Sequence, residues 1–306
     1  MKDPSVRMLD QSRIGAILTG EKQDLASGPP VTALLIQNTN PMVVAPDLNK
    51  VHAGFRRDDL FTCVHEQLLT ESAKMADIVL PATAFLEHSD IYQGGGHPHI
   101  QLGAKIVEPP GEARDNHFVI CEIAKRVGAE HPGFHMTVDE VITETLSASG
   151  LPDPESLANM RWLDYRPSYE EAHYINGFAH ADGKFHFRPN WQEFAPIAKT
   201  TAGCAHGSAD SSGMPKFPDH WDVIEEATES HPFRLITAPA RNYLNSTFTE
   251  TPTSRQREGR PSVLLHPKDA GKLGIKNGAR VCLANDRGEV TLHAELFEGL
   301  QPGVLV

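Results

Sequence analysis

Residues 32–83 constrain the fold most, because three short apolar runs alternate there with segments that suit short helices. The runs are residues 32–36, 60–64 and 77–80, and none of them alternates with polar residues. Runs of this kind are typical of strands buried on both faces of a parallel sheet. The helix-capable segments 47–54 and 70–76 lie between the runs. The pattern therefore predicts βαβ units joined by right-handed crossovers.

The segments that follow the three runs are polar or turn-forming. They are residues 37–41, 65–67 and 81–83. In open parallel sheets, ligands bind beyond the carboxyl ends of the strands. The sequence therefore predicts a ligand site at this edge of the sheet.

Two helices with clear boundaries are expected after the sheet. Asp115 is placed to cap a helix that stops near Gly128, and Thr137 with Glu140 has the capping-box spacing. Between the sheet and these helices, the triple glycine 94–96 allows close approach of backbone to a ligand. His97 and His99 have no third ligand at a metal-binding spacing, so they are interpreted as a polar loop pair.

The pattern changes near the end of the chain. Strand candidates at residues 233–237 and 263–265 precede a short helix in the segment 266–274, with Pro near its first turn and Gly after its end, and residues 280–285 and 289–296 alternate as two strands. This pattern predicts a small β-barrel module. We expect a partial α/β domain over 1–150, an irregular connecting region over 151–231 with a loose stretch at 202–218, and the barrel over 232–306.

Composition excludes several classes of protein. A chain of 306 residues is long enough for two domains, and its net charge of −12 argues against nucleic-acid binding. No apolar run approaches the roughly 20 residues that span a bilayer, and the first residues lack a secretory layout. These features predict a cytoplasmic protein. The four cysteines form no CxxC pair, so we expect buried free thiols and not a metal cluster.

Two motifs resemble a known family. The first is NTNP followed by HEQLLTESAKMADIVLPATAFLEH, and the second is LITAPARNYLNSTFTE with PSVLLHPKDAGKLGIKNGARVCLANDRGEV. They are similar to the carboxyl-terminal portion of molybdopterin oxidoreductases of the dimethyl sulfoxide reductase family, over residues 31–130 and 232–306. The resemblance implies an α/β fold: a partial parallel sheet domain, then a double-psi-like β-barrel that binds molybdopterin dinucleotide.

The same resemblance implies a function. Such a protein binds a bis-molybdopterin guanine dinucleotide with molybdenum and moves two electrons with an oxygen atom or a hydride equivalent. The family's molybdenum ligand, and any iron–sulfur cluster, belong to an amino-terminal part that this sequence does not show. We therefore expect a fragment with a truncated barrel, inactive alone, that needs its amino-terminal half or a split-gene partner chain. Formate, S-oxide, N-oxide and sulfur oxyanion substrates stay open, and no catalytic or metal-ligating residue is identified.

The cofactor is a polyanion and the chain is acidic, so binding must depend on local donors. The candidate cofactor-binding residues at the predicted sheet are Asn38, Asn40, Glu66, Thr70, Glu71 and Asp77. Those in the barrel module are Arg241, Asn242, Asn245, Ser246 and Thr247. We expect both groups to face one cleft. For two of these assignments a purely structural role stays open. Asp77 would end the short helix before its strand, and residues 241–247 would be a plain loop. A different class of function, a non-catalytic scaffold that binds a cofactor or a partner, also stays open.

Overall fold

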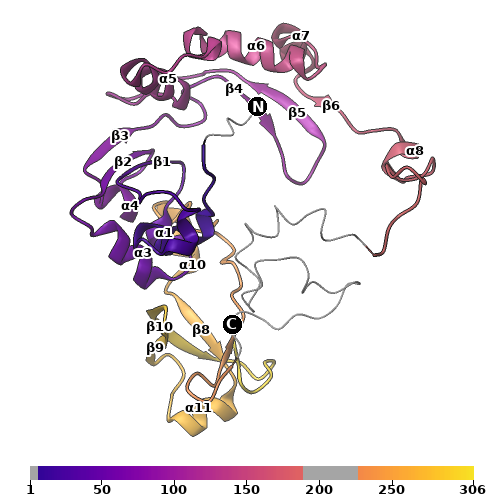
Figure 1. Cartoon of the computed structure of the whole chain (residues 1–306). Coiled ribbons are helices and arrows are strands. Elements are labelled where there is room, and N and C mark those ends of the chain that lie inside the picture. Colours follow the sequence, from indigo (N-terminus) through magenta and orange to yellow (C-terminus); the bar gives the residue numbers. More distant parts are fainter. Residues whose placement is uncertain (1–5, 189–226) are drawn as a thin grey trace. The chain divides into compact units, whose positions relative to one another are not determined.

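The computed structural model of the protein describes residues 6–188 and 227–306 (Figure 1). The stretch predicted to be loose, 202–218, lies outside the described residues, as does Cys204. The chain separates into two compact units. One comprises residues 1–34, 40–61 and 188–306, and the other comprises 35–39 and 62–187. The domain boundaries expected from the sequence stay a prediction.

The three predicted strands form one sheet in the order β1-β2-β3. Their bounds are β1 Ala33–Gln37, β2 Phe61–Glu66 and β3 Ile78–Pro81. β2 and β3 pair in parallel, with Cys63 opposite Ile78. A hydrogen bond from the amide of Phe61 to the carbonyl of Thr32 joins the starts of β2 and β1 at 2.9 Å. The side chains of Gln37 and His65 meet at their ends, 3.2 Å apart. β1 and β2 therefore also run parallel, which confirms the predicted parallel sheet.

Short helices lie between these strands, as the sequence predicts. They are α2 Pro41–Val44 and α3 Leu48–Phe55 after β1, and α4 Glu71–Lys74 after β2. The side chain of Asp47 accepts a hydrogen bond from the amide of Lys50, and that of Thr70 accepts one from the amide of Ala73. These two caps satisfy amides that have no partner within the first turn of a helix. The caps explain why α3 and α4 begin where they do.

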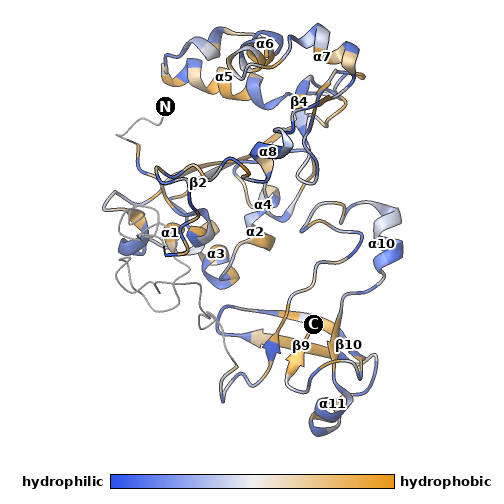
Figure 2. Cartoon of the chain, turned by 90° about the vertical axis from the view of Figure 1, so that its right-hand side faces the viewer, coloured by the Kyte–Doolittle hydropathy of each residue, from blue (hydrophilic) through white to orange (hydrophobic). Residues whose placement is uncertain are grey.

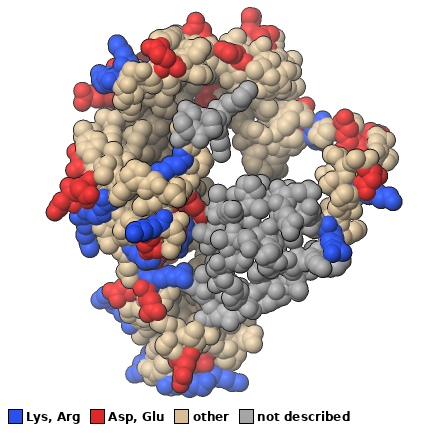
Figure 3. Space-filling model, in the orientation of Figure 1, with Lys and Arg blue, Asp and Glu red and all other residues tan. Residues whose placement is uncertain are grey.

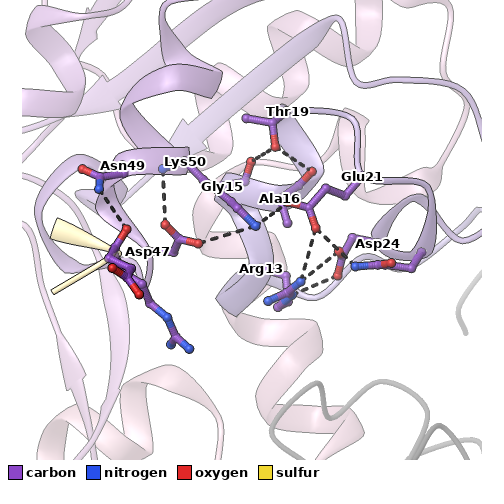
Figure 4. A network of polar contacts seen from close by, with 12 residues as sticks. Arg13, Gly15, Ala16, Thr19, Glu21, Asp24, Asp47, Asn49 and Lys50 are labelled. Atoms are coloured by element: carbon purple, nitrogen blue, oxygen red, sulfur yellow. Dashed lines mark hydrogen bonds and ion pairs between the residues drawn. The ribbon is translucent and has the colours of Figure 1, made fainter. Parts of the chain in front are cut away.

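Two glycines allow a close contact between α3 and α1, which spans Ile14–Leu18. A Cβ atom on Gly15 would lie 2.8 Å from the amide nitrogen of Val51, and one on Gly54 would lie 2.4 Å from Cβ of Leu18. Only glycine fits such a crossing without displacing a backbone. The two helices also share a polar network (Figure 4).

In that network, Arg13 makes two hydrogen bonds of 3.0 Å to the carboxylate of Asp24. Lys50 of α3 forms a 2.5 Å ion pair with Glu21, which also lies 3.7 Å from Arg13. The guanidinium of Arg13 thus meets the carboxylate of Asp24 in a bidentate ion pair. Such a pair is stronger than a single-bond ion pair, because two parallel hydrogen bonds fix its orientation. The network thus ties α3 to the segment that follows α1.

The second unit contains an antiparallel sheet that the sequence analysis missed. Its strands are β4 Asp90–Gln93, β5 His99–Gly103 and β6 Leu163–Asp164. His99 opens β5, so the interpretation of His97 and His99 as a loop pair is wrong for His99. Ile91 pairs with Leu102 across β4 and β5. The short period-two pattern of each strand is masked in the sequence by the glycine-rich turn between them.

Helices cover this antiparallel sheet with an apolar core (Figure 2). They are α6 Val138–Ala148 and α7 Pro154–Met160, and α5 Asn116–Val127 precedes them along the chain. The predicted cap at Asp115, the stop at Gly128 and the capping box of Thr137 with Glu140 are all present. The core consists of the buried side chains Ile100, Ile142, Leu146 and Leu157. α6 and α7 thus pack their apolar faces against β5 and its neighbours.

The predicted β module is a five-stranded sheet in the order β7-β11-β8-β10-β9. Its strands are β7 Arg234–Leu235, β8 Ser262–Leu265, β9 Arg280–Asn285, β10 Gly288–Leu296 and β11 Val304–Leu305. Helix α11, Pro267–Leu273, supplies Ala270 to a core with Val263, Leu265 and Leu305. The carboxylate of Asp269 accepts a 2.7 Å hydrogen bond from the amide of Gly303, so α11 is tied to the segment just before β11.

The other short elements complete the description. They are η1 Gln11–Arg13, η2 Lys22–Leu25, η3 Pro132–His135, α8 Tyr169–Ala172 and α10 Pro252–Glu258. Among the residues that the structure describes, no helix has the length and apolar character needed to cross a membrane.

Candidate cofactor-binding site

A pocket of about 390 Å³ lies at the carboxyl ends of the parallel strands, within the second unit. Asn38 after β1, Glu66 at the end of β2 and Ala82 after β3 contribute to its wall. Asn38 has a positive φ of 60°, a conformation that asparagine adopts more readily than most residues. The edge of the sheet at which the sequence predicts a ligand site thus contains a pocket.

His65 holds one side of the pocket in place. Its side chain is buried, and Nε2 lies 3.0 Å from the carbonyl of Arg114, so Nε2 donates that hydrogen bond. Nδ1 lies 3.2 Å from the side-chain amide of Gln37 and accepts its hydrogen bond. His65 therefore links β2 to β1 and to the segment before α5.

A second histidine is anchored across the pocket. Nδ1 of His88 lies 2.8 Å from the hydroxyl of Thr83. The side-chain amide of Gln67 donates a 2.8 Å hydrogen bond to the carbonyl of Thr83, and a carboxylate oxygen of Glu66 accepts one from the amide of Gln67. The segments after β2 and β3 are thus connected by polar contacts, which fixes the residues that line the pocket.

The start of α5 supplies a third side. Asp115 caps the helix by accepting a hydrogen bond from the amide of Phe118. His117 donates from Nε2 to the carbonyl of Met136 at 2.7 Å, and Sγ of Cys121 lies 3.5 Å from the same nitrogen. These contacts hold the α5 amino terminus against the segment before α6.

The electrostatic character of the pocket is mixed. Its wall carries three carboxylates, Glu66, Asp90 and Asp115, together with His65, His88 and His117. Burial, and then the nearby charge of Asp90, raise the pKa of the Tyr92 hydroxyl, so that group stays a neutral donor. Acidic side chains also gather on the visible surface of α5–α7, drawn at the top of Figure 3. Within the described residues, no group of three or more potential ligands is arranged to hold a metal ion.

Of the cofactor-binding residues predicted around the parallel sheet, some line the pocket and others do not. Asn38 and Glu66 line the pocket, whereas Thr70 caps α4 and Glu71 begins it. Asp77 lies before β3, at the amino edge of the sheet, and its carboxylate accepts a 2.7 Å hydrogen bond from the amide of Thr62.

Asn40 is buried and occupies the N-cap position of α2. None of the four residues Asn40, Thr70, Glu71 and Asp77 is part of the pocket wall. Their assignment to the cofactor stays a prediction.

The predicted residues of the β module lie in the first unit. Leu244 and Thr247 exchange backbone hydrogen bonds of 2.8 and 3.2 Å, so residues 244–247 form a tight turn. Asn245 occupies this turn with a φ of 51°, and Ser246 accepts a hydrogen bond from the hydroxyl of Thr249. Arg241 is exposed just before the turn.

Asn242 is held by helix α10. Its backbone and side-chain amides both donate to the same carboxylate oxygen of Glu258, the side-chain contact being 2.6 Å. These two hydrogen bonds occupy the amide groups of Asn242 and hold the start of the 241–247 segment against α10.

Sequence reasoning missed most of the pocket wall. His65, Thr83, His88 and His117 were not proposed as site residues, although His65 directly precedes Glu66 at a predicted strand end. The rule that ligands gather at strand carboxyl ends identifies His65 and Thr83. It does not identify His88 or His117, because the connection from β3 to α5 decides where they lie.

Comparison with known proteins identifies the domains. The sequence model of the molybdopterin oxidoreductases matches residues 12–126, and that of the molybdopterin dinucleotide-binding domain matches residues 233–306. These ranges include the parallel sheet with most of its pocket wall, and the whole five-stranded sheet. The expected cofactor, a molybdopterin guanine dinucleotide with molybdenum, is thereby confirmed.

Several relatives match along most of the chain. A probable oxidoreductase, YoaE of Bacillus subtilis, is 33% identical over all of this chain and 42% of its own length. A nitrate reductase of Symbiobacterium thermophilum is 30% identical over 87% of this chain and 35% of its own. The alpha subunit of an F420-dependent formate dehydrogenase from Methanocaldococcus jannaschii is 28% identical, over 91% and 38%. The chain thus spans less than half the length of these relatives.

A solved structure shares the fold. Acetylene hydratase from Pelobacter acetylenicus superimposes with a TM-score of 0.73 at 21% identity, covering 95% of this chain and 38% of that protein. Together with the two matched domains and the relatives, this likeness confirms the resemblance found in the sequence motifs. The chain belongs to the molybdopterin oxidoreductases of the dimethyl sulfoxide reductase family, as a partial portion that includes the dinucleotide-binding domain.

Proposed function

We propose that the chain is the carboxyl-terminal part of a molybdenum-dependent oxidoreductase and supplies walls of its bis-molybdopterin guanine dinucleotide site. The observation that carries the proposal is the pocket at the carboxyl edge of the parallel sheet, in a chain that also contains a dinucleotide-binding domain. When bound, the cofactor supplies the two-electron chemistry. The residues of this chain bind and orient it. As part of the proposal, the five-stranded sheet belongs to a double-psi-like barrel.

The pocket suits the nucleoside end of the cofactor. A volume of about 390 Å³ holds a base with its ribose and is too small for the whole dinucleotide. The carboxylates of Glu66, Asp90 and Asp115 repel phosphate, but a carboxylate accepts hydrogen bonds from the N–H groups of guanine. Asn38 offers an amide that donates to the acceptor edge of the base. Glu66 and Asn38 are therefore the proposed guanine contacts in this pocket.

Phosphate groups need cationic or N–H donors, and the segment 241–247 provides them. Arg241 is suited to grip a phosphate in bidentate fashion, and Asn245, Ser246 and Thr247 add short polar side chains. The bonds from Asn242 to Glu258 give it a supporting role, since they hold the segment in place. We propose that this segment and the residues at the sheet, Asn40, Thr70, Glu71 and Asp77 included, serve the same bound cofactor.

The test measures cofactor content in the full-length protein. Arg241→Ala or Asn245→Ala removes a contact of about 1.5–3 kcal/mol if it is charge-assisted, so cofactor affinity falls about tenfold or more. Arg255→Ala on α10 is the matched control, because it removes an exposed arginine outside the 241–247 segment. Molybdenum and guanine nucleotide per chain are measured in each variant. Unchanged content in both test variants would show that the segment is only structural.

A non-catalytic scaffold that binds the cofactor or a partner chain is the alternative. The oxidoreductase is favoured because relatives bear the names nitrate reductase, formate dehydrogenase and trimethylamine-N-oxide reductase. Those names differ in substrate, so the substrate of this protein stays open. The purified 306-residue chain is expected not to reduce or oxidise dyes with formate or sulfoxides. Cell fractionation would check the predicted cytoplasmic location.

A further inference from the structure

A turn of the dinucleotide-binding domain contacts the first turn of α3. The backbone amide of Asn49 donates a 3.1 Å hydrogen bond to the carbonyl of Arg287. The side-chain amide of Asn49 donates a second hydrogen bond, of 3.3 Å, to the carbonyl of Asp286, which lies 237 positions further along the chain (Figure 4). Both acceptors lie in the turn between β9 and β10, and α3 and this turn belong to the first unit. Asn49 thus joins α3 to the turn by two hydrogen bonds.

The β9–β10 turn is shaped for a close approach to the helix. Oδ1 of Asn285 accepts a 2.9 Å hydrogen bond from the amide of Arg287, which fixes the backbone of the turn. A Cβ atom on Gly288 would lie 3.8 Å from Cβ of Leu48, an ordinary van der Waals distance. The first amides of a helix have no acceptor within the helix. The turn therefore supplies the acceptor that the amide of Asn49 lacks in α3.

This contact joins the two domains that the family comparison identifies. α3 lies in the matched range 12–126, and the β9–β10 turn lies in the matched range 233–306. α3 follows β1, whose end leads to Asn38 of the pocket, and the turn belongs to the module that carries the 241–247 segment.

The two hydrogen bonds of Asn49 therefore give it a role in cofactor binding. We propose that Asn49 is a positioning residue for the cofactor. By holding the β9–β10 turn on α3, it keeps the dinucleotide-binding domain where the 241–247 segment serves the cofactor bound at the sheet. This inference rests on the proposed function, because it requires one cofactor that both segments bind.

The chemistry of the contact selects the variant that tests it. The acceptor is a backbone carbonyl, so the side chain of Asn49 must donate, and a carboxylate of the same shape cannot. A carboxylate in the first turn of a helix is itself favourable, because it interacts with the positive end of the helix dipole. Asn49→Asp therefore removes the bond to Asp286 and still supports α3. A residue that only stabilised the helix would tolerate this change. Asn49→Ala removes the same bond without adding a charge.

Asn277 offers the matched control. It lies in the turn before β9, and its Oδ1 accepts a 2.9 Å hydrogen bond from the amide of Leu296. A carboxylate accepts the same hydrogen bond. Asn277→Asp thus makes the same chemical change at a side chain that accepts, and it is expected to behave like the wild type.

Amide hydrogen exchange in the full-length protein measures the contact itself. In Asn49→Asp and Asn49→Ala, peptides that cover residues 47–50 and 285–288 are expected to exchange at least about threefold faster, equal to about 0.7 kcal/mol. Asn277→Asp is expected to leave both peptides unchanged. Unchanged exchange in both Asn49 variants would show that the contact does not hold the turn, and the proposal would be wrong.

The rate of cofactor release measures the positioning role. The purified full-length holoenzyme is diluted, and the molybdenum and guanine nucleotide that remain per chain are followed with time. Both Asn49 variants are expected to lose them at least about threefold faster than the wild type and Asn277→Asp. Faster amide exchange with an unchanged rate of release would mean that the contact is only structural, and would overturn the proposal. A wild-type protein that carries no guanine nucleotide would refute the proposed function itself, and with it this role of Asn49.

Discussion

The substitution Gly54→Ala tests whether the close crossing of α1 and α3 limits the stability of the first unit. A Cβ atom at position 54 would lie 2.4 Å from Cβ of Leu18. Both atoms are attached directly to the backbone, so no change of rotamer relieves the contact and the helices must separate. Overpacking of this kind typically costs about 1–3 kcal/mol. The higher helix propensity of alanine returns at most about 1 kcal/mol, so the net expectation is a destabilisation of about 1–2 kcal/mol.

The matched control is Gly271→Ala in helix α11. A Cβ atom there meets nothing within 4 Å, and α11 is regular at this position. The same substitution is therefore expected to stabilise the protein by up to about 1 kcal/mol. Urea unfolding followed by circular dichroism gives both free-energy changes, with hydrogen exchange over Leu48–Phe55 as the local readout. A Gly54→Ala variant as stable as the wild type would refute the argument from the crossing geometry.

Three further outcomes are expected. His65→Leu leaves the carbonyl of Arg114 without its donor and should cost about 1–3 kcal/mol in urea unfolding, whereas His173→Leu, on the surface, should stay within about 0.5 kcal/mol of the wild type. Thr137→Ala removes the α6 cap and should cost about 1 kcal/mol, seen as faster amide exchange at the start of α6. The hydrogen bond from Gly303 lowers the pKa of the Asp269 carboxyl, so this group stabilises the fold above its unfolded pKa of about 3.9. Its contribution is lost as pH falls through the lower folded pKa, and the stability advantage of the wild type over Asp269→Asn should shrink in an acid titration.

The sequence predicted the elements whose signals are local. The apolar runs identified β1–β3, because strands of a parallel sheet need no polar alternation, although β3 is mostly exposed in the structure. Asp115, Thr137 and Gly128 set the bounds of α5 and the start of α6, since each acts on the backbone within three or four residues of itself. The motif from Pro267 to Gly274 located α11 for the same reason.

The missed features depend on contacts between distant segments. β4 and β5 are four and five residues long and exist because they pair with each other under α6 and α7. The pocket histidines are a similar case, since the bond from His65 to Arg114 spans 49 positions. Asp77 is a different case, and its assignment to the cofactor stays a prediction. It stands beside a correct strand, but at its amino end, so nearness in sequence to the ligand edge did not mean nearness in space.

The proposed assignment of the guanine base to the pocket and of phosphate to residues 241–247 rests on local charge. A net charge of −12 gives no general attraction for a polyanion, so each contact has to match one part of the ligand. The pocket at the sheet has carboxylates and amides but no lysine or arginine in its wall, which favours the base. The 241–247 segment has an exposed arginine beside a turn, which favours phosphate. If both segments serve one cofactor, losing Arg241 should weaken binding in a salt-dependent way, whereas losing the carboxylate of Glu66 should act mainly on the choice of base.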